Sequence, residues 1–299
     1  MKRFSISDIE ILTGIKAHTI RIWEQRYNFF TSKRSDSNIR YYDNEDLRLF
    51  LNISTLNQNG YKISKISKMT LSEINTIVDD LKKDHLNSNA QVQMLANATI
   101  RLDTKEFEEV LAGCIEDMGL QEAMKEVFSP FLNKIKFMWQ VGIITTANER
   151  FAENLLCNKI ITLTNNLPEF TPSQSKKFLL FLPFGEINEI SLLFIKYLLK
   201  ENGHKILYLG AHLPLNDLIE AISVYEPEYA VTVFTQKRTV LEINNMVSRI
   251  LESSSDLSLI VSGNKIARNS FKSHPRLLVI QNTEEFIELF NSGIVSLAS

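Results

Sequence analysis

The sequence predicts a multidomain protein of the α and α/β classes. It should hold an N-terminal winged helix-turn-helix, a four-helix bundle and a C-terminal five-stranded parallel, Rossmann-like sheet of the flavodoxin type. The chain begins as helix, turn, basic helix and hairpin, its middle repeats apolar residues at helical spacing, and its last third alternates strands with helices. The expected parts are a winged helix at 1–72, a connector at 73–89, the bundle at 90–170 and the α/β domain at 175–299.

The first two helices are expected to meet at a tight turn. Ser5 is suited to cap the first helix, with Asp8 three residues on, and Gly14 lies where the chain must reverse. The second helix should run over Lys16–Arg26 and bury one side. The buried side holds Ile20, Trp23 and Tyr27, and the opposite side holds the polar donors His18, Arg21 and Gln25. Such a helix can enter the major groove of DNA.

A basic hairpin, or wing, is expected after the second helix. Arg34 on one side and Arg40 with Tyr41 on the other flank the turn-prone segment 35–38. The alternative is a surface helix with ordinary solvated charges. The occurrence of helix, turn, basic helix and basic wing in this order disfavours that alternative.

Two more helices and a polar stretch complete the first third. Asp43 is a suitable N-cap for a helix that ends at Asn59-Gly60, and Ile63 with Ile66 marks a short last helix. The segment 69–89 turns polar. It is interpreted as a helical connector ending in a linker, with a fully disordered linker as the competing view.

Residues 90–167 are predicted to be helical throughout. Apolar residues recur at helical spacing in the runs 107–118, 131–139 and 151–160, and Pro130 interrupts the middle of the segment. Four helices packed as a bundle are the expected outcome.

From Ser175 onward the pattern alternates between strand and helix. Lys177–Leu182 is a continuous apolar run, as expected for a strand buried on both faces. The other expected strands are Lys205–Leu209, Tyr229–Phe234, Leu257–Val261 and Leu277–Ile280. The expected helices are Glu189–Asn202, one after Pro214, 239–252 and 284–291. Ligands of such sheets bind at the carboxyl ends of the strands.

Charge and composition narrow the function classes. Residues 1–70 hold 12 Lys and Arg against 7 acids, and the remainder holds 21 against 28, so a basic head precedes an acidic body. No run approaches a membrane span and no signal peptide is visible, so we expect a cytoplasmic protein. Cys114 and Cys157 are expected to be buried thiols without metal-site spacing. The familiar catalytic and nucleotide-binding motifs are absent, so no enzyme is expected.

The first part of the chain resembles the DNA-binding domain of the MerR family. The resemblance rests on TIRIWEQRY at 19–27 and on the wing that begins SNIRYY at 37–42, and it covers roughly residues 3 to 70. It implies that Arg21, Arg40 and Tyr41 contact DNA, with Arg34 and His18 as weaker matches to the family's pattern.

The whole chain resembles cobalamin-binding photoreceptor repressors of the CarH and LitR type. That family carries D/E-x-H-x-x-G after its first strand, where the histidine is the lower cobalt ligand. Here Glu186 is kept, but Asn188 replaces the histidine and Ser191 the glycine. An amide has no basic ring nitrogen and cannot replace an imidazole as a strong cobalt ligand. Two later motifs also differ from the family's pattern. The position of the glycine pair holds Gly263-Asn264, and the position of the small serine motif holds Phe234-Thr235-Gln236.

Over the upper face of the corrin the family has Trp, nine residues, then Glu-His. This chain keeps Trp139 and Glu149 at that separation but has Arg150 in place of the histidine. Trp139 is interpreted as core, as pocket wall, or as both. His212 lies just past the second strand and is expected to be a satisfied loop residue. The candidate ligand pocket therefore comprises Trp139, Glu149, Arg150, Glu186, Asn188, Ser191 and Gly263.

These patterns predict a MerR-family transcriptional regulator that binds a palindromic promoter element as a homodimer or larger homo-oligomer. RNA polymerase at the promoter is a further expected partner, and no membrane or metal site is expected. No cofactor is expected to bind tightly, although cobalamin or another small ligand stays open. Two alternatives also stay open: a true cobalamin-dependent, light-responsive repressor, and a regulator whose C-terminal half is only a protein-interaction scaffold.

Overall fold

The computed structural model describes residues 3–27, 32–34, 40–81, 88–170, 172–173, 175–235, 238–263, 274–280 and 285–286. The chain divides into two compact units, Met1–Leu155 and Leu156–Ser299. The division falls within one long helix, α9 (Thr146–Asn166).

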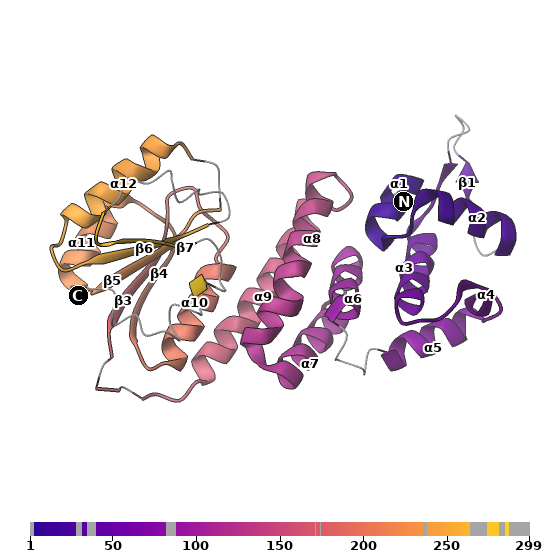
Figure 1. Ribbon diagram of the computed structural model, residues 1–299, viewed down its shortest axis with the longest axis horizontal. Helices are drawn as coiled ribbons and strands as arrows, with labels where there is room; N and C mark the ends of the chain where they lie inside the picture. Colours follow the sequence, from indigo (N-terminus) through magenta and orange to yellow (C-terminus); the bar gives the residue numbers. More distant parts are fainter. Residues whose placement is uncertain are drawn as a thin grey trace. The chain divides into compact units, whose positions relative to one another are not determined.

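The first unit begins with the predicted winged helix-turn-helix (Figure 1). Its elements are α1 (Ile6–Thr13), α2 (Ala17–Tyr27), β1 (Lys33–Arg34), β2 (Arg40–Tyr41), α3 (Asn44–Gln58), α4 (Ile63–Ile66) and α5 (Leu71–Leu81). Both strands of the wing are present, whereas its turn at 35–39 lies outside the described residues. Asp43 caps α3 in a capping box with Asp46. Buried Ile74 and Val78 lie on α5, which packs against α3, so this helix belongs to the folded head.

Four helices follow, as predicted: α6 (Ser88–Arg101), α7 (Thr104–Ala123), α8 (Ser129–Gln140) and α9, with the π-helical turn η1 (Met124–Phe128) between α7 and α8. Gly119 breaks the regular geometry of α7 with a φ of +76°. Pro130 lies in the first turn of α8, directly after η1, so the regular α-helical hydrogen-bond pattern is interrupted by a π-helical turn next to the proline, as the sequence indicated. The core includes Phe107, whose ring meets those of Phe131 and Phe151 edge-on at 5.7 Å.

The second unit contains the predicted five-stranded parallel sheet. The strands are β3 (Lys177–Pro183), β4 (Lys205–Leu213), β5 (Tyr229–Val233), β6 (Ser258–Ser262) and β7 (Leu277–Ile280), in the order β4-β3-β5-β6-β7. This is the flavodoxin-type order, with the topological switch between β3 and β5. The sequence pattern predicts that β4 ends at Leu209, but the strand continues to Leu213 through register shifts opposite Phe181 and Pro183. Most of the helix predicted at 284–291 lies outside the described residues.

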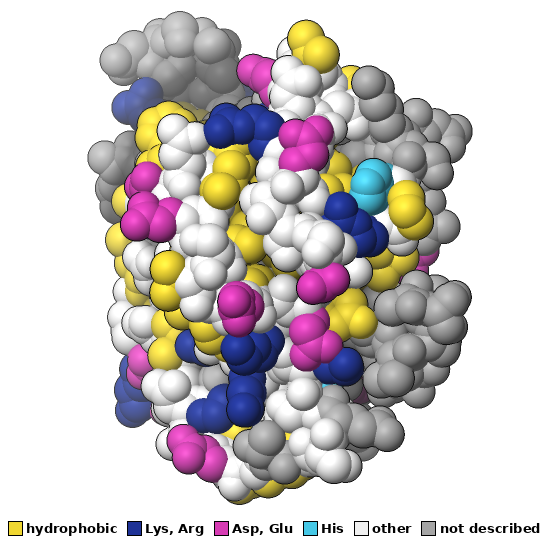
Figure 2. Space-filling view, turned by 90° about the vertical axis from the view of Figure 1, so that its left-hand side faces the viewer, with side chains coloured by type: hydrophobic (Ala, Val, Ile, Leu, Met, Phe, Trp, Pro, Cys, Tyr) yellow, Lys and Arg dark blue, Asp and Glu magenta, His cyan; other side chains and the backbone are white. Residues whose placement is uncertain are grey.

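Helices cover both faces of the sheet (Figure 1): α10 (Ile190–Glu201) lies on one face, and α11 (Leu215–Tyr225) and α12 (Val240–Glu252) lie on the other. The core under α11 and α12 includes Leu179, Phe181, Ile222 and Val247, all buried. Figure 2 shows basic and acidic side chains interspersed over the face of this unit that is turned to the viewer. Such mixed charge is typical of a solvated surface.

The two cysteines are free thiols, as expected. Cys114 is buried, and burial raises the pKa of its thiol to about 12. Cys157 is half-buried rather than buried. Among the described helices, none is long and apolar enough to cross a membrane.

Candidate functional site

Glu10 fixes the turn between α1 and α2. Gly14 adopts the left-handed conformation at φ +73°, and its N–H donates to the Glu10 carbonyl at 2.8 Å. The Glu10 carboxylate accepts the Ala17 N–H at 3.0 Å and lies 3.2 Å from Lys16 Nζ. These contacts, the Ala17 bond foremost, hold the pKa of the Glu10 carboxyl below its ordinary value. The start of α2 is thus oriented by α1.

Two other helices hold the end of α1. Ser54 Oγ on α3 donates to the Thr13 carbonyl at 2.6 Å, and Gln93 Nε2 on α6 donates to the Leu12 carbonyl at 3.4 Å. Lys134 Nζ on α8 donates to Gln93 Oε1 at 2.5 Å. The bonds to Leu12 and Thr13 satisfy carbonyls that a helix C-terminus leaves without intrahelical partners.

The two sides of α2 separate as the helical period requires. Ile20 and Trp23 are buried, while the predicted DNA-facing residues His18, Arg21 and Gln25 are all exposed. Tyr27, expected on the buried side, is only half-buried. Arg26 is also exposed, and sequence reasoning missed it as a candidate because it lies at the predicted end of the helix.

The wing brings two cations face to face. In the antiparallel pair β1–β2, Arg34 lies opposite Arg40, and both are exposed. Like charges directly opposite each other are destabilising unless an anion or another partner relieves them. Tyr41 lies beneath the Arg3 guanidinium, 4.6 Å from the ring centroid. Behind the wing, Lys33 pairs with Asp43, which lowers the pKa of that carboxyl to about 2.

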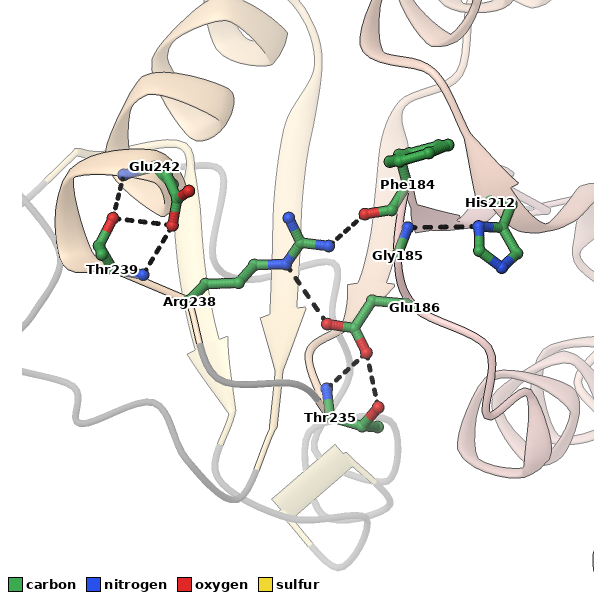
Figure 3. A network of polar contacts seen from close by, with 8 residues as sticks. All are labelled: Phe184, Gly185, Glu186, His212, Thr235, Arg238, Thr239 and Glu242. Atoms are coloured by element: carbon green, nitrogen blue, oxygen red, sulfur yellow. Dashed lines mark hydrogen bonds and ion pairs between the residues drawn. The ribbon is translucent and has the colours of Figure 1, made fainter. Parts of the chain in front are cut away.

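The carboxyl end of the sheet holds a second polar network, shown in Figure 3. Glu186, in the loop after β3, is fully buried, and one of its oxygens accepts the Thr235 N–H at 2.9 Å and the Thr235 hydroxyl at 2.5 Å. Arg238 Nε lies 3.4 Å from the other oxygen, and a second Arg238 nitrogen donates to the Phe184 carbonyl. The loops after β3 and β5 are therefore tied together at the switch point where sheets of this order bind ligands.

The other predicted pocket residues of the sheet have local structural partners. Asn188 Oδ1 accepts the Ile190 N–H at 3.2 Å, at the start of α10, and Ser191 follows in the first turn of that helix. A Cβ on Gly263 would lie 2.2 Å from the Phe234 carbonyl oxygen. The lack of a side chain at this position therefore makes room for the backbone of Phe234. Gln236 and Asn264, also singled out in the sequence, lie outside the described residues.

His212 is the described imidazole nearest to this network, as Figure 3 shows. Its Nδ1 accepts the Gly185 N–H at 3.3 Å. The nitrogen that accepts this bond is engaged with the loop backbone. His212 therefore has the local partner expected of a loop residue. Within the described part of the chain, no three His, Cys, Asp or Glu side chains gather in a way that could hold a metal.

The bundle residues of the candidate pocket lie near the junction of α8 and α9. Trp139 is 41% exposed, so it is not core, and its Nε1 donates to Thr146 Oγ1 at 3.1 Å. Glu149 is half-buried in the first turn of α9, and Arg150 is exposed and paired with Glu153 at 3.0 Å. Trp139, Glu149 and Arg150 belong to the first unit and the sheet residues to the second, so the candidate pocket as a whole stays a prediction.

Sequence reasoning missed Arg238 and the role of Thr235. Only the strand order could have identified them, because the adjacency of β3 and β5 in the sheet is what brings residue 186 close to residues 235 and 238.

Comparisons with known proteins agree with this architecture. Residues 4–73 match the model of the MerR HTH family regulatory protein, and residues 91–164 match that of the B12 binding domain. The HTH-type transcriptional repressor CarH of Myxococcus xanthus is 22% identical over 246 residues, covering 80% of this chain and 81% of CarH. The HTH-type transcriptional regulator MlrA of Escherichia coli is 30% identical over 84 residues, covering 28% of this chain and 34% of MlrA.

Among solved structures, the monomethylamine corrinoid protein of Methanosarcina barkeri aligns with a TM-score of 0.52 and 16% identity, over 73% of this chain and 99% of that protein. At this identity the match supports the fold alone. The head, the helical module and the homology to CarH and to the repressor CarA agree with one another. The chain therefore carries a DNA-binding domain of the MerR type and a module of the B12-binding type, and it is homologous to the transcriptional repressors CarH and CarA.

Proposed function

We propose that the head binds double-stranded promoter DNA through His18, Arg21 and Gln25 on α2 and through Arg34, Arg40 and Tyr41 on the wing. The observation that carries the proposal is the exposed side of α2, where His18, Arg21 and Gln25 lie opposite the buried side chains of the same helix. A symmetric pair of chains would bind a two-fold operator and meet RNA polymerase there. The protein acts in the cytoplasm, without a catalytic role.

The C-terminal module is proposed to have lost cobalamin ligation. The lower-ligand position holds Asn188, whose amide oxygen accepts the Ile190 N–H, and the nearby His212 accepts the Gly185 N–H through Nδ1. The buried Glu186, which the resemblance would place beside a ligating histidine, is instead bonded to Thr235 and Arg238. Trp139, Glu149 and Arg150 remain the candidate ligand-facing residues of the bundle.

The test uses the full chain and DNA selected by it from a random library. Adenosylcobalamin is titrated in darkness, and DNA binding is then measured before and after green light. No stoichiometric complex and no change in DNA affinity are expected. A stoichiometric complex at micromolar cofactor, or release of DNA by light, would restore the light-responsive repressor. Mutation of the helical module could also abolish self-association while no small molecule is bound. That result would favour a regulator whose C-terminal half is only a protein-interaction scaffold.

A further inference from the structure

Helix α6 lies between the DNA-binding head and the helical module of the first unit. It packs against α3 of the head and against α7, η1 and α8 of the module. Nine of its 14 residues are buried, and four of these are polar: Gln91, Gln93, Asn97 and Thr99. Burying a polar side chain is unfavourable unless it finds hydrogen-bond partners, so the partners of these residues show what α6 holds together.

The amide of Gln93 joins α6 to two other helices. Its Nε2 donates to the Leu12 carbonyl at the end of α1 at 3.4 Å and to Asn97 Oδ1 at 3.1 Å. Its Oε1 accepts from Lys134 Nζ on α8 at 2.5 Å. Leu12 lies two residues before Gly14, where the chain turns toward the proposed recognition helix α2. One buried amide therefore connects α8 of the helical module with the turn of the helix-turn-helix.

Asn148 connects α6 with the junction of α8 and α9. Its Nδ2 donates to the carbonyls of Thr99 at 2.8 Å and Ile100 at 3.3 Å, close to the C-terminal end of α6. Its Oδ1 accepts the N–H and the hydroxyl of Thr145, directly before α9. Trp139 lies at the same junction, near the end of α8. Helix α6 is thus held near its end by this junction and in its middle by α1 and α8.

The observed position of α6 also carries a cost. Gln91 is fully buried, and neither its Nε2 nor its Oε1 has a hydrogen-bond partner in the described part of the chain. A buried amide without partners destabilises the arrangement that contains it. The bond from Gln93 to Leu12 is near the upper limit of hydrogen-bond length, so it is weak. A helix held by weak polar bonds against a built-in cost is suited to shift between two arrangements.

We propose that α6 is a coupling helix, which transmits a change at the α8–α9 junction to the turn between α1 and α2. A shift of α6 alters the bond from Gln93 to Leu12, and hence how firmly the end of α1 is held. Glu10 on α1 bonds both Gly14 at the turn and Ala17 at the start of α2, so the recognition helix follows. This coupling would regulate the proposed DNA binding without itself being a DNA contact.

The test is hydrogen exchange of the full chain without DNA, read by mass spectrometry over residues 10–17. Gln93→Leu removes the donor to the Leu12 carbonyl, so exchange there should be about three- to tenfold faster. Gln91→Leu is the matched variant, two residues away on the same helix. It removes the amide without partners, so exchange over residues 10–17 should be about threefold slower or more.

Asn148→Asp tests the coupling from the far end of α6. The aspartate keeps an acceptor for Thr145 but has no donor for the carbonyls of α6. Exchange over residues 10–17 should therefore be severalfold faster, although residue 148 has no printed bond to the head. Residues 107–118 of α7 are the internal reference and should exchange as in the wild type.

Wild-type exchange over residues 10–17 in either Gln93→Leu or Asn148→Asp overturns the proposal. So does exchange in Gln91→Leu that is not slower, or an equal rise over residues 107–118, which would indicate general destabilisation. If Gln93→Leu does not fold, the opposite signs expected of Gln91→Leu and Asn148→Asp decide the question. The proposed DNA binding can fail or hold independently of this result, because no DNA is present.

Discussion

The Arg40 guanidinium on the wing lies 3.5 Å from the Glu24 carboxylate on α2. The other Glu24 oxygen accepts the Tyr42 hydroxyl at 2.8 Å, and burial together with this bond raises the pKa of Tyr42. One carboxylate therefore links the proposed recognition helix to the wing. Because Arg40 is half-exposed, this ion pair adds little stability by itself, and its value lies in orientation.

Arg40→Ala should weaken binding to every DNA sequence by a similar factor. The arginine is proposed to bind a phosphate, and removing one phosphate-binding cation reduces the slope of log affinity against log salt by about one. Fluorescence anisotropy with selected and scrambled DNA over a salt series measures both effects. An unchanged slope would remove the wing from the proposed interface.

Arg21→Ala should instead weaken binding to the selected sequence by roughly 1–3 kcal/mol, with much less effect on scrambled DNA. The reason is that Arg21 lies on the exposed side of the proposed recognition helix α2, and arginine is the side chain that most often reads a base edge in the major groove. Arg249→Ala on α12 is the control and should bind as the wild type does. Equal losses on both DNAs would make Arg21 a phosphate contact.

Thr235→Val should destabilise the α/β unit by about 1–3 kcal/mol, because it removes a hydroxyl donor from the buried Glu186 carboxylate while keeping the side-chain shape. Hydrogen exchange of the β3 and β5 segments, read by mass spectrometry, reports the change. The control is Thr162→Val, whose exposed hydroxyl donates only to the Asn158 carbonyl one turn earlier. Equal protection in the two variants would contradict the role given to Thr235.

Gly263→Ala should destabilise the same unit by about 1–3 kcal/mol, since the new methyl group would meet the Phe234 carbonyl and push β5 from β6. Gly142→Ala is the comparison, because its Cβ would meet nothing within 4 Å, so it measures the strain of positive φ alone. If Gly263→Ala is as stable as the wild type, the glycine does not serve strand packing.

The stability of the first unit should rise with pH between about 8 and 10. Burial lowers the pKa of the Lys134 ammonium from its ordinary 10.5 to about 8 in the folded state. In that range the unfolded chain binds more protons than the folded one, so raising the pH favours folding, by up to about 3 kcal/mol for this shift. Tryptophan fluorescence follows this unit, because both tryptophans of the chain, Trp23 and Trp139, lie in it.

Lys134→Met is the matched variant for that measurement. The difference in unfolding free energy between wild type and variant should rise over this pH range, because other titrating groups contribute equally to both proteins. A difference that is constant with pH would mean that Lys134 is solvated in the folded chain.

Much of the fold could be predicted from sequence, since periodicity is a local property. The apolar run 177–182 indicated a buried strand, which the structure confirms, and β7 begins and ends where the pattern places it. The extension of β4 to Leu213 could not be predicted from the sequence pattern, because register shifts opposite Phe181 and Pro183 accommodate the extra length. The polar residues around α5 suggested a helical connector, so the packing of this helix in the head was not predicted.

The site was less predictable, because its contacts join distant parts of the chain. The exposed side of α2 followed from helical spacing. In contrast, the bonds from Glu186 to Thr235 and Arg238 depend on the order of the strands, and the bond from Gln93 to Leu12 depends on how α6 meets α1. Neither arrangement leaves a motif in the sequence.

The bond from Gln93 to the end of α1 has a consequence for protein engineering. Gln93 lies within the stretch that matches the B12 binding domain, yet it donates to the Leu12 carbonyl beside the helix-turn-helix. A hybrid regulator joined anywhere in 82–87 would therefore combine a transplanted head with a foreign helix that lacks this donor. The transferable recognition module ends after α6, so exchanges of sensory halves should be cut beyond Arg101.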